Sequence, residues 1–271
     1  MTAAKASKQA RALQPPPDWW REYFTPLARE VYAGPLKDPV ATGHEVDFLA
    51  SVFDGVDGPL LDIGAGFGRH VRGMRKRRFR VVALDALRHM VASHPARGRR
   101  AVVADMRRPP FRPGAFAGAW CLFNSFGYFP FDENPGMFAE WARVLAPGAR
   151  LVLQAPNRPV MAQIARDFPP SHMMQSDFML TETYEYDAAT RTLHGVGAWM
   201  YKDQQQSWEM FVRMYTLGEL ARELRRAGLE VERACEDYSG APFDAKESPQ
   251  MVIVARKPTG PAPEAKRKAS S

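Results

Sequence analysis

Cysteine is scarce in this sequence, with only Cys121 and Cys235 among 271 residues. Two cysteines at this separation indicate neither the disulfide framework of a small secreted protein nor a cysteine-based metal cluster. Cys121 also lies within an apolar, strand-like run, where a buried structural thiol is expected rather than a reactive one. The sequence therefore predicts no bound metal ion.

Long apolar runs are also missing. No segment approaches the roughly 18 consecutive apolar residues of a membrane-spanning helix. Residues 1–14 are polar and basic, without the apolar core of a signal peptide. We therefore expect no membrane partner and no export, and a cytoplasmic location. At 271 residues, one α/β unit with an insertion accounts for nearly the whole chain.

Acidic residues are outnumbered by basic ones, which gives a formal net charge of +7. Much of the excess lies near the ends, where residues 1–17 and 259–271 are predicted to be disordered basic tails around a domain at residues 18–258. Two arginine clusters, at residues 72–80 and 97–100, come directly before predicted strands. Ligands of open α/β sheets bind at the carboxyl ends of strands, so nucleic acid is not an expected partner.

The most informative stretch is residues 60–70, with the sequence LLDIGAGFGRH. It predicts a buried strand that runs into a glycine loop and then opens a helix, a geometry that lets a nucleotide approach the backbone. A dinucleotide-binding loop needs its third glycine at position 69, but Arg69 stands there and the third glycine is Gly68. Asp62, which is acidic near the end of the strand, is a second departure from that pattern.

This acidic G-x-G-x-G pattern resembles motif I of class I S-adenosylmethionine-dependent methyltransferases. The likeness continues along residues 18–258 and is strongest through Leu151, because two further predicted strands end in Asp85 and Asp105. In that family the first of these carboxylates holds the ribose hydroxyls and the second holds the adenine amino group. The resemblance implies S-adenosyl-L-methionine as cofactor, with contacts from Tyr23, Asp62, Gly64, Ala65, Gly66, Gly68, Asp85, Ala86, Asp105, Met106, Leu122 and Phe123.

The fold implied by the resemblance is a doubly wound, mostly parallel seven-stranded α/β sheet with an antiparallel β insertion at residues 156–215 as a substrate lid. Strands are expected at residues 60–63, 81–85, 101–105, 119–123, 149–155 and 251–258. In the insertion, residues 178–187, 192–203 and 207–215 alternate as three strands, and residues 157–175 are expected to be a mobile covering loop.

Helix boundaries are predicted from capping residues. Thr42 and Thr216 each stand three residues before a glutamate, which is the capping-box pattern. A third helix, which begins near Pro135, is expected to end at the Pro147-Gly148 turn. The aromatic residues 18–24 are predicted either to anchor a helix on the domain surface or to cover the cofactor.

The residues after the fourth strand favour a small acceptor. Asn124-Ser125-Phe126-Gly127 differs from the Asn-Pro-Pro-Tyr-like pattern of enzymes that methylate nucleobase or glutamine amines, and it resembles small-molecule methyltransferases. We therefore expect methyl transfer to a nitrogen or oxygen of a small molecule. Candidates for an acid or base are Tyr128, His172, His194 and Tyr215.

Several alternatives stay open at this point. The chain could instead be an RNA or protein methyltransferase that uses its basic surface, a protein that binds S-adenosylmethionine without turnover, or a nicotinamide oxidoreductase. Homodimerisation is also kept open. The sequence does not name the acceptor.

Overall fold

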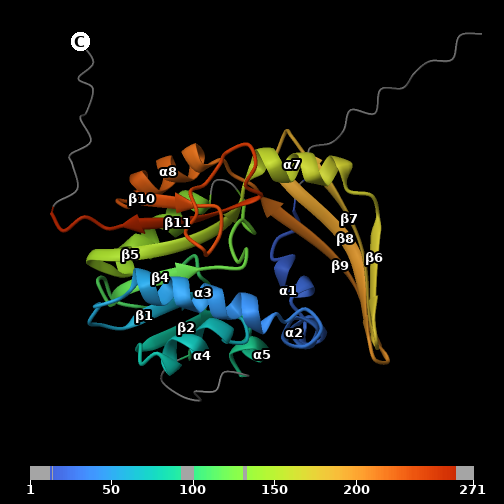
Figure 1. The fold of residues 1–271 in the computed structure, drawn as a ribbon, viewed down its shortest axis with the longest axis horizontal. Coiled ribbons are helices and arrows are strands. Elements are labelled where there is room, and N and C mark those ends of the chain that lie inside the picture. Colours follow the sequence, from blue (N-terminus) through green and yellow to red (C-terminus); the bar gives the residue numbers. More distant parts are fainter. Residues whose placement is uncertain (1–12, 14, 93–100, 131–132, 261–271) are drawn as a thin grey trace, which may run out of the picture.

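The computed structural model describes residues 13, 15–92, 101–130 and 133–260, in which two β-sheets face each other across two short helices (Figure 1). The larger sheet has seven strands in the order β10-β11-β5-β4-β1-β2-β3. Their bounds are β1 Leu60–Ile63, β2 Val81–Asp85, β3 Ala101–Val103, β4 Phe116–Cys121, β5 Leu145–Pro156, β10 Glu230–Cys235 and β11 Gln250–Arg256. Strands β1 to β5 pair in parallel, and β11 pairs antiparallel with both β5 and β10. The predicted fold class is confirmed.

Helices cover this sheet, and residues between them connect the strands. Their bounds are α3 Pro39–Val52, α4 Arg69–Lys76, α5 Arg88–Val91, α6 Asn134–Val144 and α8 Leu217–Arg226. All four residues of β1 are buried, as expected for a central parallel strand with both faces covered. The predicted Thr216 capping box is present at the start of α8.

Two predicted helix boundaries are wrong. The helix expected to start at Thr42 begins one turn earlier, because Asp38 accepts hydrogen bonds from the amides of Val40 and Ala41 while Pro39 fills the first helical position. Glu45 is therefore not at the helix N-terminus, and its side chain pairs with Arg69 and His70 of α4. Helix α6 ends at Val144 rather than at the Pro147-Gly148 turn, since β5 begins at Leu145.

The inserted region forms a second, four-stranded antiparallel sheet in the order β6-β7-β8-β9. Its strands are β6 Ser171–Gln175, β7 Phe178–Asp187, β8 Thr192–Tyr201 and β9 Gln204–Arg213. Three of them correspond to the strands predicted here. The expected covering loop at residues 157–175 is wrong, because this segment contains helix α7 Arg158–Asp167, whose N-cap residue is Asn157, and the edge strand β6.

Helices α1 Trp20–Tyr23 and α2 Pro26–Ala33 lie between the two sheets (Figure 1). Trp19, Trp20 and Tyr23 are all less than 10 % exposed, and the Tyr23 ring packs edge-on against Trp199 and Trp208 of the second sheet. Burial of these three rings, each about 150–250 Å², fastens the N-terminal segment into the core. The segment is therefore an internal wall and not a surface-anchored helix.

The arginines at the amino ends of the strands make local contacts. Arg75 donates to the Val81 carbonyl, Arg77 pairs with Asp47, and Arg80 pairs with Asp57. The cluster at residues 97–100 and most of both predicted tails lie outside the described residues. Within the described part of the chain, no helix combines the length and apolar character needed to cross a bilayer.

Candidate functional site

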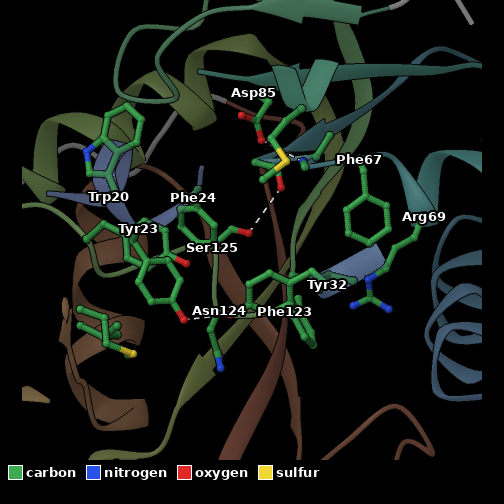
Figure 2. A pocket seen from close by; sticks show the side chains of 18 of the residues that line it. Trp20, Tyr23, Phe24, Tyr32, Phe67, Arg69, Asp85, Phe123, Asn124 and Ser125 are labelled. Carbon is green, nitrogen blue, oxygen red and sulfur yellow. Dashed lines mark hydrogen bonds between the residues drawn. The ribbon is translucent and has the colours of Figure 1, made fainter. Parts of the chain in front are cut away.

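A cavity of about 490 Å³ opens where the carboxyl ends of β1, β2 and β4 meet the second sheet (Figure 2). One side is formed by the glycine loop and the turns after β2, β3 and β4, and we call it the loop wall (Gly64 to Phe67, Asp85 to Leu87, Asp105, Met106 and Leu122 to Ser125). The other side comes from α1 with its flanking residues, α2, β7, β9 and Tyr128 of the segment between β4 and α6, and we call it the aromatic wall (Trp19, Trp20, Tyr23, Phe24, Tyr32, Tyr128, Tyr184 and Met210). A volume of this size fits a small-molecule ligand.

The glycine loop leaves the space that a ligand needs. Gly64, Gly66 and Gly68 all have positive φ, at 70°, 53° and 78°, which L-residues with a side chain rarely adopt. A Cβ at Gly64 would also lie 2.8 Å from the Ser125 Cβ. Gly64 therefore lets the backbone of the loop lie directly against the turn after β4, while a Cβ at Gly66 would meet open space.

Asp85 ties the loop wall together. Its two carboxylate oxygens accept one backbone hydrogen bond each, from Gly66 at 2.8 Å and from Leu87 at 2.9 Å. Burial raises the pKa of this carboxyl, and the two amide bonds oppose that shift. Each oxygen keeps a second lone pair, so Asp85 can accept two further hydrogen bonds from hydroxyls in the cavity.

Asp105 is held differently. Arg107 donates to both of its oxygens through the guanidinium and to one through its backbone amide. Burial alone would raise the pKa of Asp105, but the hydrogen bonds and charge of Arg107 outweigh it and lower the pKa. Arg107 also pairs with Glu133 and lies over the Phe129 ring, so a rigid cluster borders this end of the cavity.

Two predicted cofactor residues do not line the cavity. Asp62 is 2 % exposed within β1 and lies behind the loop, where burial raises its pKa to about 8 against the opposing charge of Arg69. Gly68 is the N-cap residue of α4 and has a left-handed backbone. The other ten predicted contacts, Tyr23, Gly64, Ala65, Gly66, Asp85, Ala86, Asp105, Met106, Leu122 and Phe123, all line it.

The aromatic wall presents phenol hydroxyls. The hydroxyls of Tyr23 and Tyr32 lie 2.8 Å apart in a hydrogen bond, and Tyr184 donates its hydroxyl proton to Glu182 at 2.7 Å. Burial raises the pKa of all three phenols, so they stay neutral at ordinary pH. Of these three tyrosines, only Tyr23 was predicted from the sequence. Tyr32 and Tyr184 reach the cavity from α2 and β7, which are far apart in the chain.

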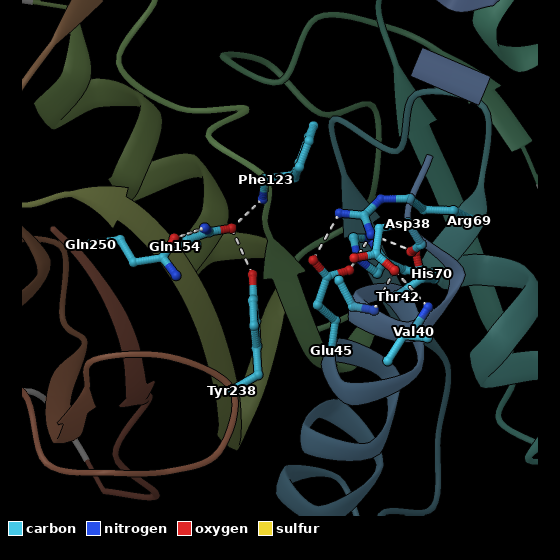
Figure 3. A network of polar contacts seen from close by, with 11 residues as sticks. Asp38, Val40, Thr42, Glu45, Arg69, His70, Phe123, Gln154, Tyr238 and Gln250 are labelled. Atoms are coloured by element: carbon cyan, nitrogen blue, oxygen red, sulfur yellow. Dashed lines mark hydrogen bonds and ion pairs between the residues drawn. The ribbon is translucent and has the colours of Figure 1, made fainter. Parts of the chain in front are cut away.

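A buried ionic cluster closes the cavity on the side of α3 (Figure 3). Glu45 pairs with the Arg69 guanidinium through both oxygens and with His70 Nε2 at 2.7 Å. Burial would raise the pKa of Glu45, but the bonds and charges of His70 and Arg69 lower it; burial lowers the pKa of His70. Arg69 also donates to Thr42 and lies 4.6 Å from the centre of the Phe123 ring. The sequence pattern used Arg69 only to exclude a dinucleotide-binding loop, and it did not predict the pairing of Arg69 with Glu45.

The turn after β4 is held in an uncommon conformation. Phe123 and Asn124 have φ of 55° and 53°, in the left-handed region that side chains other than glycine seldom occupy. The Phe123 amide donates to the Gln154 side chain, which also accepts from the Tyr238 hydroxyl (Figure 3). Buried polar partners on β5 and after β10 therefore fix the strained turn that borders the cavity.

Of the four acid or base candidates, only Tyr128 lines the cavity. Tyr215 is 1 % exposed, stacked on Phe126, and accepts a hydrogen bond from Asn134. His172 is exposed on the edge strand β6, and His194 lies between Glu185 and Glu209 on the second sheet. None of these three side chains is placed to act on a ligand in the cavity.

Residues 60–148 match a family described as a methyltransferase domain. No curated protein is matched significantly by the sequence. Among solved structures, the CcbJ methyltransferase from Streptomyces caelestis superposes with a TM-score of 0.70 at 19 % identity, covering 85 % of this chain and 96 % of that one. A S-adenosylmethionine-dependent methyltransferase from Clostridium acetobutylicum gives 0.73 at 12 % identity, with 86 % and 97 % covered.

An amino pentose methyltransferase, CalS10 from Micromonospora echinaspora, gives a TM-score of 0.65 at 20 % identity, with 86 % of this chain and 98 % of that chain covered. At these identities the structural likeness shows the fold alone, and the family match covers residues 60–148 of the 271. Residues 60–148 therefore resemble a methyltransferase domain within a chain that has the class I fold, and S-adenosylmethionine is the cofactor that this likeness indicates.

Proposed function

We propose that this protein transfers the methyl group of S-adenosylmethionine to a nitrogen or oxygen nucleophile of a small molecule. The observation that carries the proposal is that the loop wall and the aromatic wall line one cavity of about 490 Å³. A cavity of this volume suits a cofactor together with a compact acceptor and gives little room to a folded macromolecule.

The roles of the loop-wall residues follow from their geometry. We assign the free lone pairs of Asp85 to the ribose hydroxyls, because the Gly66 and Leu87 amides already orient its carboxylate. We assign Asp105 and the Met106 backbone to the adenine, at the end of the wall that Arg107 stiffens. We assign the remainder of the cofactor to the backbone of the glycine loop, which has no side chain at Gly64 because a Cβ there would collide with Ser125.

The cofactor supplies a methyl group on a positively charged sulfonium, which is already electrophilic. The acceptor's lone pair forms the new bond to carbon, and the electron pair of the carbon–sulfur bond leaves with sulfur. The protein's contribution is to align the nucleophile with that bond and to exclude water. The buried rings of Trp19, Trp20 and Tyr23 are suited to exclusion, because their segment is fastened between the two sheets.

Cytoplasmic location and a lack of nucleic-acid partners belong to the same proposal. Support for the second comes from the arginines at the amino ends of the strands, of which Arg77 and Arg80 pair with neighbouring aspartates. These arginines also lie at the edge of the sheet opposite the cavity.

Methyl transfer is tested by incubating the protein with methyl-labelled S-adenosylmethionine and a small-molecule extract of its host. We expect label in a product that passes a membrane retaining macromolecules, and we expect this label to disappear when S-adenosylhomocysteine is added in excess. Label confined to RNA or protein, or the absence of any labelled product, would contradict the proposal.

A further inference from the structure

The aromatic wall has features that favour a positively charged ligand. Phenol rings attract cations through their faces, and Tyr23, Tyr32, Tyr128 and Tyr184 all line the cavity. A carboxylate lies directly behind this wall, because Glu182 on β7 accepts the Tyr184 hydroxyl proton and interacts electrostatically with Tyr32. Negative ring faces backed by a carboxylate are a suitable environment for an ammonium group.

The hydrogen bonds of Tyr184 define what it can offer to a ligand. Its only O–H proton is donated to Glu182, so its oxygen keeps lone pairs that can only accept. Ser171 donates to the other oxygen of Glu182 at 3.4 Å, so both carboxylate oxygens have a partner on this sheet. Tyr184 therefore presents an acceptor to the cavity, and an N–H group of the substrate is its natural partner.

Strand β8 is shaped to hold this tyrosine ring. Gly195 lies directly across from Tyr184 in the β7–β8 pair, and a Cβ at that position would lie 2.7 Å from the Tyr184 ring and 2.8 Å from Met210. The glycine is not needed for backbone reasons, because its φ is not positive. Its effect is to give the Tyr184 ring room against the sheet at the edge of the cavity.

From this geometry we propose, building on the proposed function, that the acceptor is a primary or secondary amine, which enters as an ammonium and loses its proton through Tyr184 to Glu182. The N–H bond breaks and its proton passes to the Tyr184 oxygen, while the Tyr184 hydroxyl proton passes to the Glu182 carboxylate. The nitrogen keeps the electron pair and becomes the neutral nucleophile. Glu182 is only partly buried, so it can return the proton to solvent.

An alcohol acceptor fits this arrangement poorly. An alcohol hydroxyl is about as weak an acid as water, whose pKa is about 15.7, whereas an alkylammonium has a pKa near 10 that a neighbouring sulfonium would lower further. Proton transfer to a carboxylate through a phenol is uphill for both, but it is less unfavourable for the ammonium by several pKa units. The titratable groups around Tyr184 are Glu182, Tyr23 and Tyr32, and the phenols remain protonated.

The first test identifies the methylated atom. The labelled product is first separated from unreacted S-adenosylmethionine, which is itself a cation, and is then passed over a cation-exchange resin at acid pH, where methylated amines are retained and methyl ethers or esters of neutral molecules are not. We expect the label on the resin. Label in the flow-through would overturn the amine proposal while leaving methyl transfer intact, and a wild-type protein that fails to bind S-adenosylhomocysteine would instead overturn the proposed function.

The second test separates a proton-transfer role from a structural one. Tyr184→Phe keeps the ring and removes the relay, so we expect its initial rate with the purified amine to be about 100-fold lower than wild type near pH 7. Near pH 9.5 the deficit should shrink at least about tenfold, because the amine is then partly neutral in solution. Glu182→Gln should show the same rescue by pH.

Tyr186→Phe is the matched control, since Tyr186 lies on the same strand, packs near Arg166 and does not line the cavity. It should match wild type at both pH values, and all three variants should bind S-adenosylhomocysteine as wild type does. A deficit in Tyr184→Phe that is equal at both pH values, or no deficit relative to Tyr186→Phe, would overturn the relay.

Discussion

Replacing Asp85 with alanine is the sharpest perturbation of the loop wall. The side chain lies at the end of β2 and accepts amide hydrogen bonds from Gly66 and Leu87 at 2.8 and 2.9 Å. These bonds use one lone pair on each oxygen, and under the proposed function the remaining two accept hydrogen bonds from the ribose hydroxyls. The variant removes both ligand bonds together with the two contacts that orient them.

The expected magnitude follows from the charge on the lost partner. Hydrogen bonds to a charged group contribute about 1.5–3 kcal/mol each. In the Asp85→Ala variant, water can fill the space left by the carboxylate and solvate the ribose hydroxyls. We therefore take that range as the total loss for the two ligand hydrogen bonds. A loss of this size weakens the binding of S-adenosylhomocysteine by about 10- to 150-fold.

Isothermal titration calorimetry measures this change directly, with circular dichroism to show that the variant is folded. Asp57→Ala is the control, because that aspartate has a fully exposed side chain that pairs with Arg80 and does not line the cavity. The control should bind as wild type does. An Asp85→Ala protein that is folded and binds S-adenosylhomocysteine with unchanged affinity would refute the assignment of this carboxylate.

Three further substitutions test the stability and the shape of the site. Glu45→Gln should lower the free energy of unfolding by about 3–5 kcal/mol at pH 7 by stranding Arg69. Because the folded pKa of Glu45 is lowered from 4.5, urea titrations should show the deficit shrink as pH falls below 4.5 toward that lower pKa. Asp62 stays protonated when folded up to about pH 8 but ionises near 3.8 when unfolded, so wild-type stability falls as pH rises between these values. Asp62→Asn should therefore gain on wild type in urea titrations between pH 5 and pH 8, and parallel pH profiles would contradict the burial of this charge. Gly195→Ala should displace Tyr184 and slow methyl transfer at least about tenfold, while calorimetry shows unchanged S-adenosylhomocysteine binding; a normal rate would show that the ring can move aside.

The loop wall was predictable because its signals are local in sequence. A buried strand, three glycines and a following helix occupy residues 60–70, and the carboxylate of Asp85 follows the next strand directly. Parallel strands bring such residues to one edge of the sheet, so order along the chain is enough to place them. Asp62 shows the limit of this reasoning, because acidic character at a strand end does not say which side of the sheet the side chain faces.

The aromatic wall could not be assembled in the same way. Tyr32 comes from α2 and Tyr184 from β7, and only the packing of the second sheet on α1 and α2 brings them together. One signal was available: the pair of glycines at Gly195 and Gly197 interrupts an otherwise bulky strand, which indicates close approach of a ring or backbone.

The α3 boundary shows a competition between two local signals. Thr42 and Glu45 have the capping-box spacing, but Asp38 followed by Pro39 forms the actual start of the helix. Proline at the first helical position has its φ preset and has no amide to satisfy, which favours the earlier start. Glu45 is then in the second turn of the helix, where Arg69 and His70 of α4 bind it.

The central claim, that the cavity is a S-adenosylmethionine site, is tested most directly by titrating the wild-type protein with S-adenosylhomocysteine in a calorimeter. We predict saturable binding to one site per chain with a dissociation constant below about 1 mM, equivalent to at least about 4 kcal/mol. The absence of saturable binding by folded protein over that concentration range would contradict the account.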